Sequence, residues 1–159
     1  MVTPLSNGEL ITRLLLAAAI GAVLGLEREW RMKTAGLRTN ILIALGSAVF
    51  TVVSHDMVAG IAGADPARIA AQIVTGIGFL GAGAIMRTDS GIHGLTTAAT
   101  VWVNASLGVA VGGGEYRLAI IGATITLAVL LVLHPIEVSL DRRWRALRAR
   151  RATDPPTGA

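Results

Sequence analysis

Apolar residues gather in five long runs that are separated by short polar segments. The runs cover residues 10–26, 37–54, 69–86, 95–112 and 118–134. Each run is close to the ~17 residues that an α-helix needs to cross the hydrocarbon core of a bilayer. None shows the strict alternation of a barrel strand, so helices satisfy the backbone hydrogen bonds best. The pattern predicts an all-α polytopic membrane protein whose transmembrane domain, residues 1–135, is a bundle of five helices.

The third run is the one around which we expect the bundle to form. At ~100° per residue, one side of this helix is polar or small and the opposite side is apolar. Glycines open further faces, and small residues in membrane helices mark places where another backbone approaches closely. These helix-packing candidates are Gly76, Gly78, Gly81 and Gly83, together with the GxxxG pair Gly21 and Gly25 of the first run. We therefore predict that the third helix is buried inside the bundle.

The segment that follows the fifth run has a different character. His134-Pro135 predicts a helix end, because proline cannot continue the helical hydrogen-bond ladder. Residues 136–151 then predict a basic amphipathic helix that lies on the membrane surface and attracts anionic lipids. Its lipid-binding candidates are Trp144, Arg142, Arg143, Arg145 and Arg148. Nucleic acid is the less favoured partner for these arginines beside a membrane, and residues 152–159 are expected to be disordered.

Composition and charge agree with a membrane location. The chain has 159 residues, of which 53% are hydrophobic and 15% charged, and its mean hydropathy is +0.65. An ordinary soluble domain is more polar than this. If all five runs cross, one side of the membrane carries most of the loop cations: Arg28, Arg31, Lys33, Arg38, Arg87, Arg142, Arg143, Arg145, Arg148, Arg150 and Arg151. The positive-inside rule then places the N-terminus outside and the C-terminus in the cytoplasm.

Polar residues at the ends of the runs and inside the third and fourth runs form the candidate functional set. Glu27 closes the first run, and an ionisable group at this depth is expected to pair with a base such as Arg38. The alternative interpretation is that these side chains only reach the headgroup interface. The full set is Glu27, Arg28, Arg38, Asn40, Arg68, Gln72, Thr96, Thr97, Thr100 and Asn104.

The fourth run contributes the most informative of these residues. Thr96 or Thr97 is expected to cap the helix. Thr100, Asn104 and Gly108 recur every four residues and predict a stripe that faces the third helix. An unpaired amide in hydrocarbon is costly, so Asn104 either lines a path or joins two helices, and we favour the second interpretation.

Signals for a metal or for catalysis are weak. Asp56 and Asp65 are the metal candidates, since carboxylates suit magnesium, but Asp65-Pro66 is equally typical of a helix start. The chain has no cysteine, its three histidines are far apart in the sequence, and no serine stands in a nucleophile elbow. We therefore expect no enzymatic activity and no resident cofactor, with magnesium entering only as a substrate or a signal.

Four stretches, in this order and spacing, resemble the MgtC/SapB family of bacterial inner-membrane proteins. They are GAVLGLERE at 21–29, AGLRTN at 35–40, RIAAQIVTGIGFLGAG at 68–83 and GLTTAATVW at 94–102. The resemblance implies a domain of about five helices and a role in growth under magnesium limitation, with a link to virulence in pathogens. It also implies ATP synthase as a membrane partner. Longer relatives add a soluble C-terminal domain where this sequence has a basic segment, so functions that need that domain are not expected.

Two hypotheses about function follow. The first is a non-enzymatic membrane protein that acts through helix contacts with itself, as a homo-oligomer, or with another membrane protein. The second is a transporter or channel for magnesium or another cation. A path for a divalent cation ordinarily contains a carboxylate, and the third and fourth runs contain none, which favours the first hypothesis.

Overall fold

The computed structural model describes residues 5–59, 61, 63–89 and 91–153, with most of the segment 134–153 described by its backbone. The elements are α1 (Asn7–Trp30), α2 (Leu37–Val58), α3 (Arg68–Ala84), β1 (Met86–Thr88), β2 (Gly91–His93), α4 (Leu95–Gly112) and α5 (Tyr116–Thr153). Within these residues, α1, α2, α4 and the first part of α5 are long and apolar enough to cross a membrane. The predicted all-α polytopic membrane protein is confirmed.

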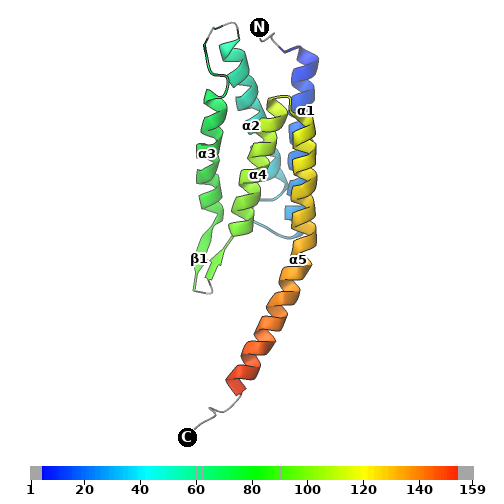
Figure 1. Cartoon of the computed structure of the whole chain (residues 1–159), viewed down its shortest axis with the longest axis vertical. Helices are drawn as coiled ribbons and strands as arrows, with labels where there is room; N and C mark the ends of the chain where they lie inside the picture. The colour runs from blue at the N-terminus through cyan, green and yellow to red at the C-terminus, as the bar shows by residue number, and fades with distance from the viewer. Residues whose placement is uncertain (1–4, 60, 62, 90, 154–159) are drawn as a thin grey trace. The chain divides into compact units, whose positions relative to one another are not determined.

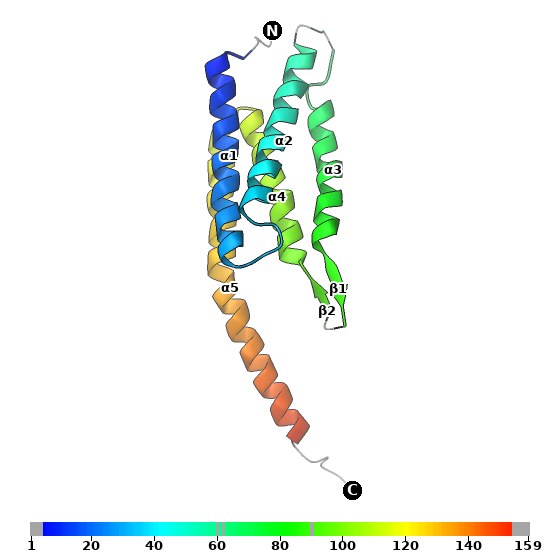
Figure 2. The same cartoon turned by 180° about the vertical axis from the view of Figure 1, so that it is seen from behind.

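The chain divides into two compact units, Met1–Thr124 and Ile125–Ala159. In the first unit, successive helices run in alternating directions, and short connections join their ends (Figure 1, Figure 2). Helix α2 contacts α1, α3 and α4, and helix α4 contacts α1, α2 and α3. The core of this unit therefore lies around α2 and α4.

Glycines allow α2 to approach two of its neighbours closely. A Cβ atom built on Gly21 would lie 2.6 Å from the carbonyl oxygen of Asn40, and one on Gly25 would lie 2.8 Å from the Cα of Leu37. On α4, a Cβ on Gly112 would lie 2.7 Å from the carbonyl oxygen of Ala48. These distances are too short for any side chain, so α1 and α4 meet α2 almost backbone to backbone.

Helix α3 does not occupy the buried position that we predicted. Of its described residues only Ile77 is buried, and a Cβ on Gly76, Gly78 or Gly83 would meet open space. Gly81 makes an ordinary contact, 3.8 Å from Ala98. The close contacts to α2 are made by the glycines of α1 and α4, and this arrangement leaves α3 at the edge of the unit. The prediction of a buried third helix was wrong.

The end of the third apolar run forms a β-hairpin instead of helix. Helix α3 ends at Ala84, and β1 pairs with β2 in antiparallel register, with Met86 opposite His93. Gly94 then has a φ of +88°, a conformation that glycine adopts without cost, and its Cβ would overlap the carbonyl group of Ala84. Glycine at this position lets α4 begin directly beside the end of α3.

Helix α5 also differs from the prediction. Pro135 lies inside α5 and does not end it. Proline removes one hydrogen bond from the ladder, and the helical backbone continues on both sides. Residues Ala152 and Thr153, expected in a disordered tail, belong to α5, and 154–159 lie outside the described residues. The side chains of Arg142, Arg143, Trp144, Arg145 and Arg148 are likewise outside the described part, so their binding to lipid stays a prediction.

Candidate functional site

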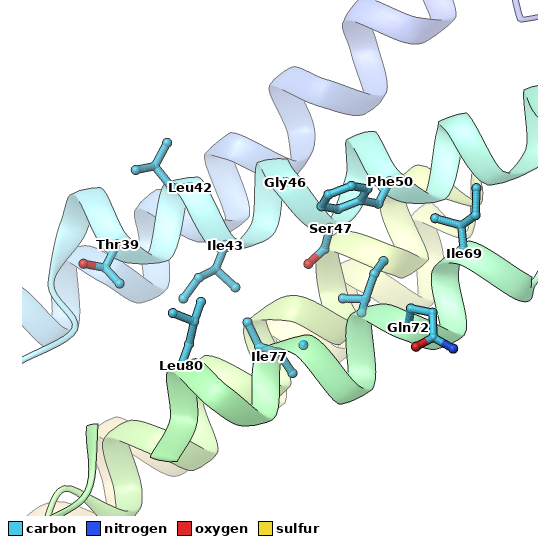
Figure 3. Close-up of a pocket in the computed structure, with 12 residues that line it drawn as sticks. Thr39, Leu42, Ile43, Gly46, Ser47, Phe50, Ile69, Gln72, Ile77 and Leu80 are labelled. Carbon is cyan, nitrogen blue, oxygen red and sulfur yellow. The ribbon is translucent and has the colours of Figure 1, made fainter. Parts of the chain in front are cut away.

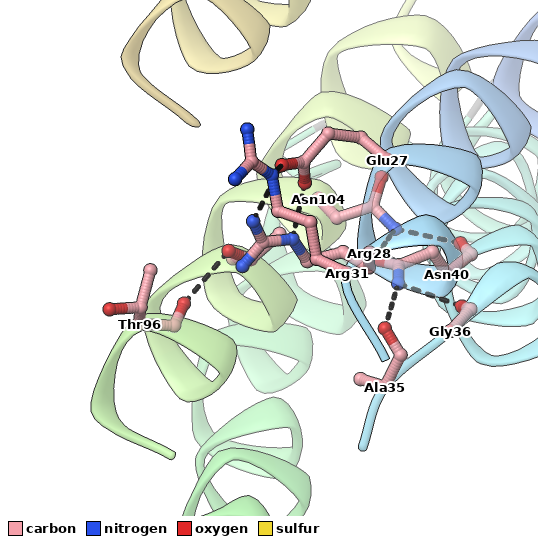
Figure 4. Close-up of polar contacts among 9 residues, drawn as sticks. Glu27, Arg28, Arg31, Ala35, Gly36, Asn40, Thr96 and Asn104 are labelled. Atoms are coloured by element: carbon pink, nitrogen blue, oxygen red, sulfur yellow. Dashed lines mark hydrogen bonds and ion pairs between the residues drawn. The ribbon is translucent and has the colours of Figure 1, made fainter. Parts of the chain in front are cut away.

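Polar side chains from α1, α2 and α4 meet in one buried cluster (Figure 4). We call Glu27, Arg28, Arg31, Asn40, Thr100 and Asn104 the polar network. Glu27 is 4% exposed and Arg28 is 3% exposed. The Arg28 guanidinium donates from Nε and Nη2 to the Glu27 carboxylate at 2.5 and 2.9 Å, and Arg31 donates to the same carboxylate from Nε. The negative charge of Glu27 is therefore balanced by Arg28 of α1 and by Arg31, the C-cap residue of the same helix.

Arg38 is not the partner of Glu27. It is exposed at the start of α2, whereas Arg31 lies one helical turn beyond Glu27 on the same face. Residues i and i+4 are neighbours on a helix, so this pair forms without help from the rest of the fold. The predicted pairing with Arg38 was wrong, and the predicted need of Glu27 for a base is met locally.

Two asparagines connect α4 to the beginning of α2. Asn104 Nδ2 donates to the backbone carbonyl oxygen of Asn40 at 2.7 Å and to its Oδ1 at 3.1 Å. Asn40 Nδ2 in turn donates to the carbonyl oxygens of Ala35 and Gly36 at 2.8 and 2.9 Å. Both side chains are fully buried. Asn104 thus joins two helices, which is the interpretation that we favoured from the sequence.

The stripe on α4 faces α2, and not α3 as we predicted. Besides the bonds of Asn104, a Cβ on Gly108 would lie 2.8 Å from the Ser47 Cβ. Thr100 is buried and donates to the carbonyl oxygen of Thr96 at 2.8 Å. A polar or small stripe of this kind fits any neighbouring helix, so its spacing alone did not identify α2.

The polar network keeps some hydrogen-bonding capacity. Within the described residues, Arg28 Nη1 and Asn104 Oδ1 are buried and have no hydrogen-bond partner. Buried polar atoms are nearly always satisfied by protein or by ordered water. Ordered water is therefore the partner that fits these two enclosed atoms.

The other predicted site residues do not join the network. Arg68 and Gln72 are exposed on α3. Thr97 is buried and Thr96 is exposed, but neither caps α4, because the N-cap residue is Gly94 and it makes no side-chain hydrogen bond. The helix starts at Leu95, two residues too early for Thr96 to be its N-cap.

The two aspartates considered for metal binding lie on the surface. Asp56 and Asp65 are both exposed, and Asp65 Oδ1 accepts from the backbone N–H of Ala67 at 2.8 Å just before α3. This is the helix-start turn that we considered as the alternative. The described residues contain no group of three or more His, Asp or Glu side chains arranged to hold a metal ion.

Three further side chains form hydrogen bonds at helix ends, and none of them was among the predicted site residues. Arg13 is buried and donates from Nη1 to the Gly112 carbonyl oxygen at 2.6 Å, at the end of α4. Glu29 accepts from the Leu37 N–H at 3.0 Å, at the start of α2. Ser54 donates to the carbonyl oxygen of Pro66 at 2.5 Å. An arginine inside an apolar run was the available signal for Arg13, since such a charge needs a partner.

Replacing Asn104 by alanine is expected to destabilise the first unit by ~1–3 kcal/mol, because Asn40 loses the donor to its side-chain and backbone oxygens. Unfolding of the purified protein in detergent, followed by circular dichroism, measures the loss. Ser106→Ala is the matched control, since Ser106 is exposed and bonds only within its own helix, to the Val103 carbonyl oxygen at 2.7 Å. Equal stability of the two variants would contradict a joining role for Asn104.

Comparison with known proteins gives a consistent picture. The model of the MgtC family matches residues 14–139. "Putative magnesium transporter YhiD" of Escherichia coli (strain K12) is 49% identical over 139 residues, which cover 84% of this chain and 65% of that protein. "Protein MgtC" of Salmonella typhi is 48% identical over 143 residues, covering 84% of this chain and 60% of that protein.

A third relative is less similar in sequence. "Uncharacterized protein slr0014" of Synechocystis sp. is 40% identical over 139 residues, covering 85% of this chain and 56% of that protein. The chain thus spans between half and two thirds of the length of these curated relatives. No solved structure matches the chain.

Proposed function

Because the chain belongs to the MgtC family, we propose that it is a non-enzymatic membrane protein that supports growth when magnesium is scarce. It acts through contact with itself or with another membrane protein, of which ATP synthase is the example that the family resemblance implies. In a pathogen the same activity contributes to virulence. The loop charges favour the bacterial inner membrane with the N-terminus outside, which puts the polar network near the cytoplasmic face.

The observation that carries this proposal is the outer face of α3. Ala71, Thr75, Gly78 and Ala82 are all exposed, and their spacing of four, three and four residues places them along one side of the helix. Small residues in this arrangement allow another membrane helix to pack closely. Within the described chain this side of α3 faces no other helix, so it offers a contact surface to a second protein.

The polar network supports the same conclusion. Its carboxylate is balanced by Arg28 and Arg31, and its two asparagines hold α2 and α4 together. These groups are used to stabilise the helix arrangement. A protein built in this way acts through the surface that the arrangement presents to the membrane.

Gly78→Leu is expected to weaken partner binding and growth in low magnesium, because a leucine on the outer face of α3 keeps another helix at a distance. Complementation of a strain that lacks the gene measures growth, and cross-linking in membranes measures assembly; a drop of about tenfold in the cross-linked fraction is expected, corresponding to ~1.4 kcal/mol. Val23→Leu on the exposed side of α1 is the control. Unchanged growth and unchanged cross-linking in Gly78→Leu would refute the proposal.

A second candidate function is magnesium transport, and the name of the YhiD relative, a putative magnesium transporter, favours it. The polar network would then supply the polar lining of a route. Glu27 argues against this, since a carboxylate already bound by two arginines attracts a divalent cation weakly. Magnesium flux into liposomes containing the purified protein, lost in Asn104→Ala with the fold retained, would replace the first proposal by this one.

A further inference from the structure

We propose that the groove between α2 and α3 binds one acyl chain of an anionic phospholipid, with the phosphate headgroup at the end near Arg38. The groove is a single open cavity of about 590 Å³. Ile43 and Ser47 of α2 face Ile77 and Leu80 of α3 across it (Figure 3). Its walls are mostly apolar, so its occupant is apolar along most of its length.

The length of the groove fits one leaflet of a bilayer. On α2 the lining residues run from Thr39 to Phe50 and on α3 from Ile69 to Leu80. Either stretch is twelve residues, and the eleven steps from its first to its last residue span ~16 Å at 1.5 Å per step. Half of a ~30 Å hydrocarbon core is ~15 Å, the depth that one acyl chain spans. A second, smaller cavity of about 310 Å³ shares Thr39, Ile43 and Leu80 with the groove. Thr34 and Ala35 also line it, so it extends the groove toward the segment between α1 and α2.

An acyl chain is much thinner than a helix, which is ~10 Å across with its side chains, and it can follow an irregular apolar groove. The cations beside one end of the groove favour a lipid over a protein helix, because they complement a phosphate group.

Charge decides which end takes the headgroup. At the Thr39 end, Lys33 and Arg38 are exposed beside residues that line the two cavities. At the Ile69 end, Arg68 is exposed together with the carboxylates of Asp56 and Asp65. A negative phosphate group is attracted by the first set and opposed by the acids of the second. The lipid is therefore oriented with its phosphate beside Lys33 and Arg38.

The carboxylates near the Arg38 end do not cancel this attraction. Glu27 is buried and balanced by Arg28 and Arg31. Glu29 accepts a hydrogen bond from the backbone N–H of Leu37. Both acids are committed to protein donors, so the exposed cations remain available to a headgroup.

The absence of cysteine in the natural chain allows a local test. A fluorophore on the single cysteine of Leu42→Cys, at the rim of the groove, reports nearby lipid through quenching by a nitroxide on the acyl chain. The full chain is placed in bilayers with labelled phosphatidylglycerol or labelled phosphatidylcholine. Two cations at ~1 kcal/mol each predict a preference for phosphatidylglycerol of about 30-fold at this position. The reference label is placed on Val23→Cys, at an exposed position of α1. Its ratio of quenching by phosphatidylglycerol to quenching by phosphatidylcholine is expected to be near one.

Three variants separate the headgroup from the chain. Lys33→Gln/Arg38→Gln should reduce the preference at position 42 to about that of the reference label. Gly76→Leu, which adds a side chain to the groove wall where a Cβ meets open space, should remove the preference and leave the fold intact. Arg68→Gln, at the opposite end, should change nothing. Circular dichroism and melting in detergent establish that each variant is folded.

Several results would overturn the assignment. A preference near one in the unaltered chain, or one that survives Lys33→Gln/Arg38→Gln, would exclude recognition of the anionic headgroup. A label at position 42 that neither lipid quenches would show that a second copy of the chain covers the groove. The groove lies on the side of α3 that faces α2, away from Gly78, so this proposal and the proposed function can fail separately.

Discussion

Replacing Glu27 by glutamine is expected to destabilise the first unit by ~3–5 kcal/mol, because it leaves the Arg28 guanidinium buried without a counter-charge. Arg28 is 3% exposed, so neither bulk water nor a lipid headgroup can take over the role of the carboxylate. Loss of the folded fraction during solubilisation, and a lower midpoint in a denaturant titration, measure the effect. Glu115→Gln, at an exposed carboxylate before α5, is the control and should change stability by less than ~0.5 kcal/mol.

A double variant tests the reason for this loss. Glu27→Gln/Arg28→Met removes both charges, so the buried uncompensated guanidinium disappears. We expect the double variant to be more stable than Glu27→Gln alone, because replacement of a whole buried pair is often close to neutral. If the losses of the two single variants simply add, Glu27 and Arg28 do not act as a pair, and the argument for charge balance in the polar network is wrong.

Replacing Gly108 by alanine is expected to destabilise the same unit by ~3 kcal/mol, the upper end of the cost of overpacking. The added Cβ would overlap the Ala44 carbonyl oxygen and lie 2.8 Å from the Ser47 Cβ. A long side chain could avoid the new Cβ by changing its rotamer, but backbone atoms cannot. Helices α2 and α4 must therefore move apart. That movement also lengthens the hydrogen bonds between Asn104 and Asn40, one turn away on the same two helices.

Gly46→Ala is the matched control for this prediction. Gly46 lies in the middle of α2, and a Cβ there would have no neighbour within 4 Å. Alanine should leave the stability unchanged or raise it by up to ~1 kcal/mol through its better helix propensity. Melting curves of both variants, recorded in the same detergent, decide the question. Equal melting points would mean that α2 and α4 are farther apart than the structure places them.

The apolar pattern of the sequence determined the existence and type of nearly all the elements. The predicted run 95–112 coincides with α4, because Gly94 and Gly113 end the apolar pattern and the helix at the same places. The first run was predicted too short. α1 begins at Asn7, where Ser6 accepts from the Glu9 N–H at 3.2 Å, and it continues through the charged turn to Trp30. Polar helix ends are capped by side chains and need no apolar residues, so hydropathy does not detect them.

The sequence also identified residues that prove to be buried, but not all of their partners. Of the ten polar candidates, six are buried: Glu27, Arg28, Asn40, Thr97, Thr100 and Asn104. The other four, Arg38, Arg68, Gln72 and Thr96, are exposed. The hairpin of β1 and β2 was missed, since two strands of three residues each are too short to produce a recognisable alternation.

Only the tertiary structure decided which faces meet. Gly21, Gly25 and Gly108 lie against α2, whereas Gly76 and Gly78 of the equally glycine-rich α3 face open space. Sequence could not separate these cases, because lipid and the interior of a helix bundle are both apolar and place the same demands on a side chain. Periodicity therefore determines that a small or polar face exists. Whether that face meets another helix depends on the connections and contacts of the whole bundle.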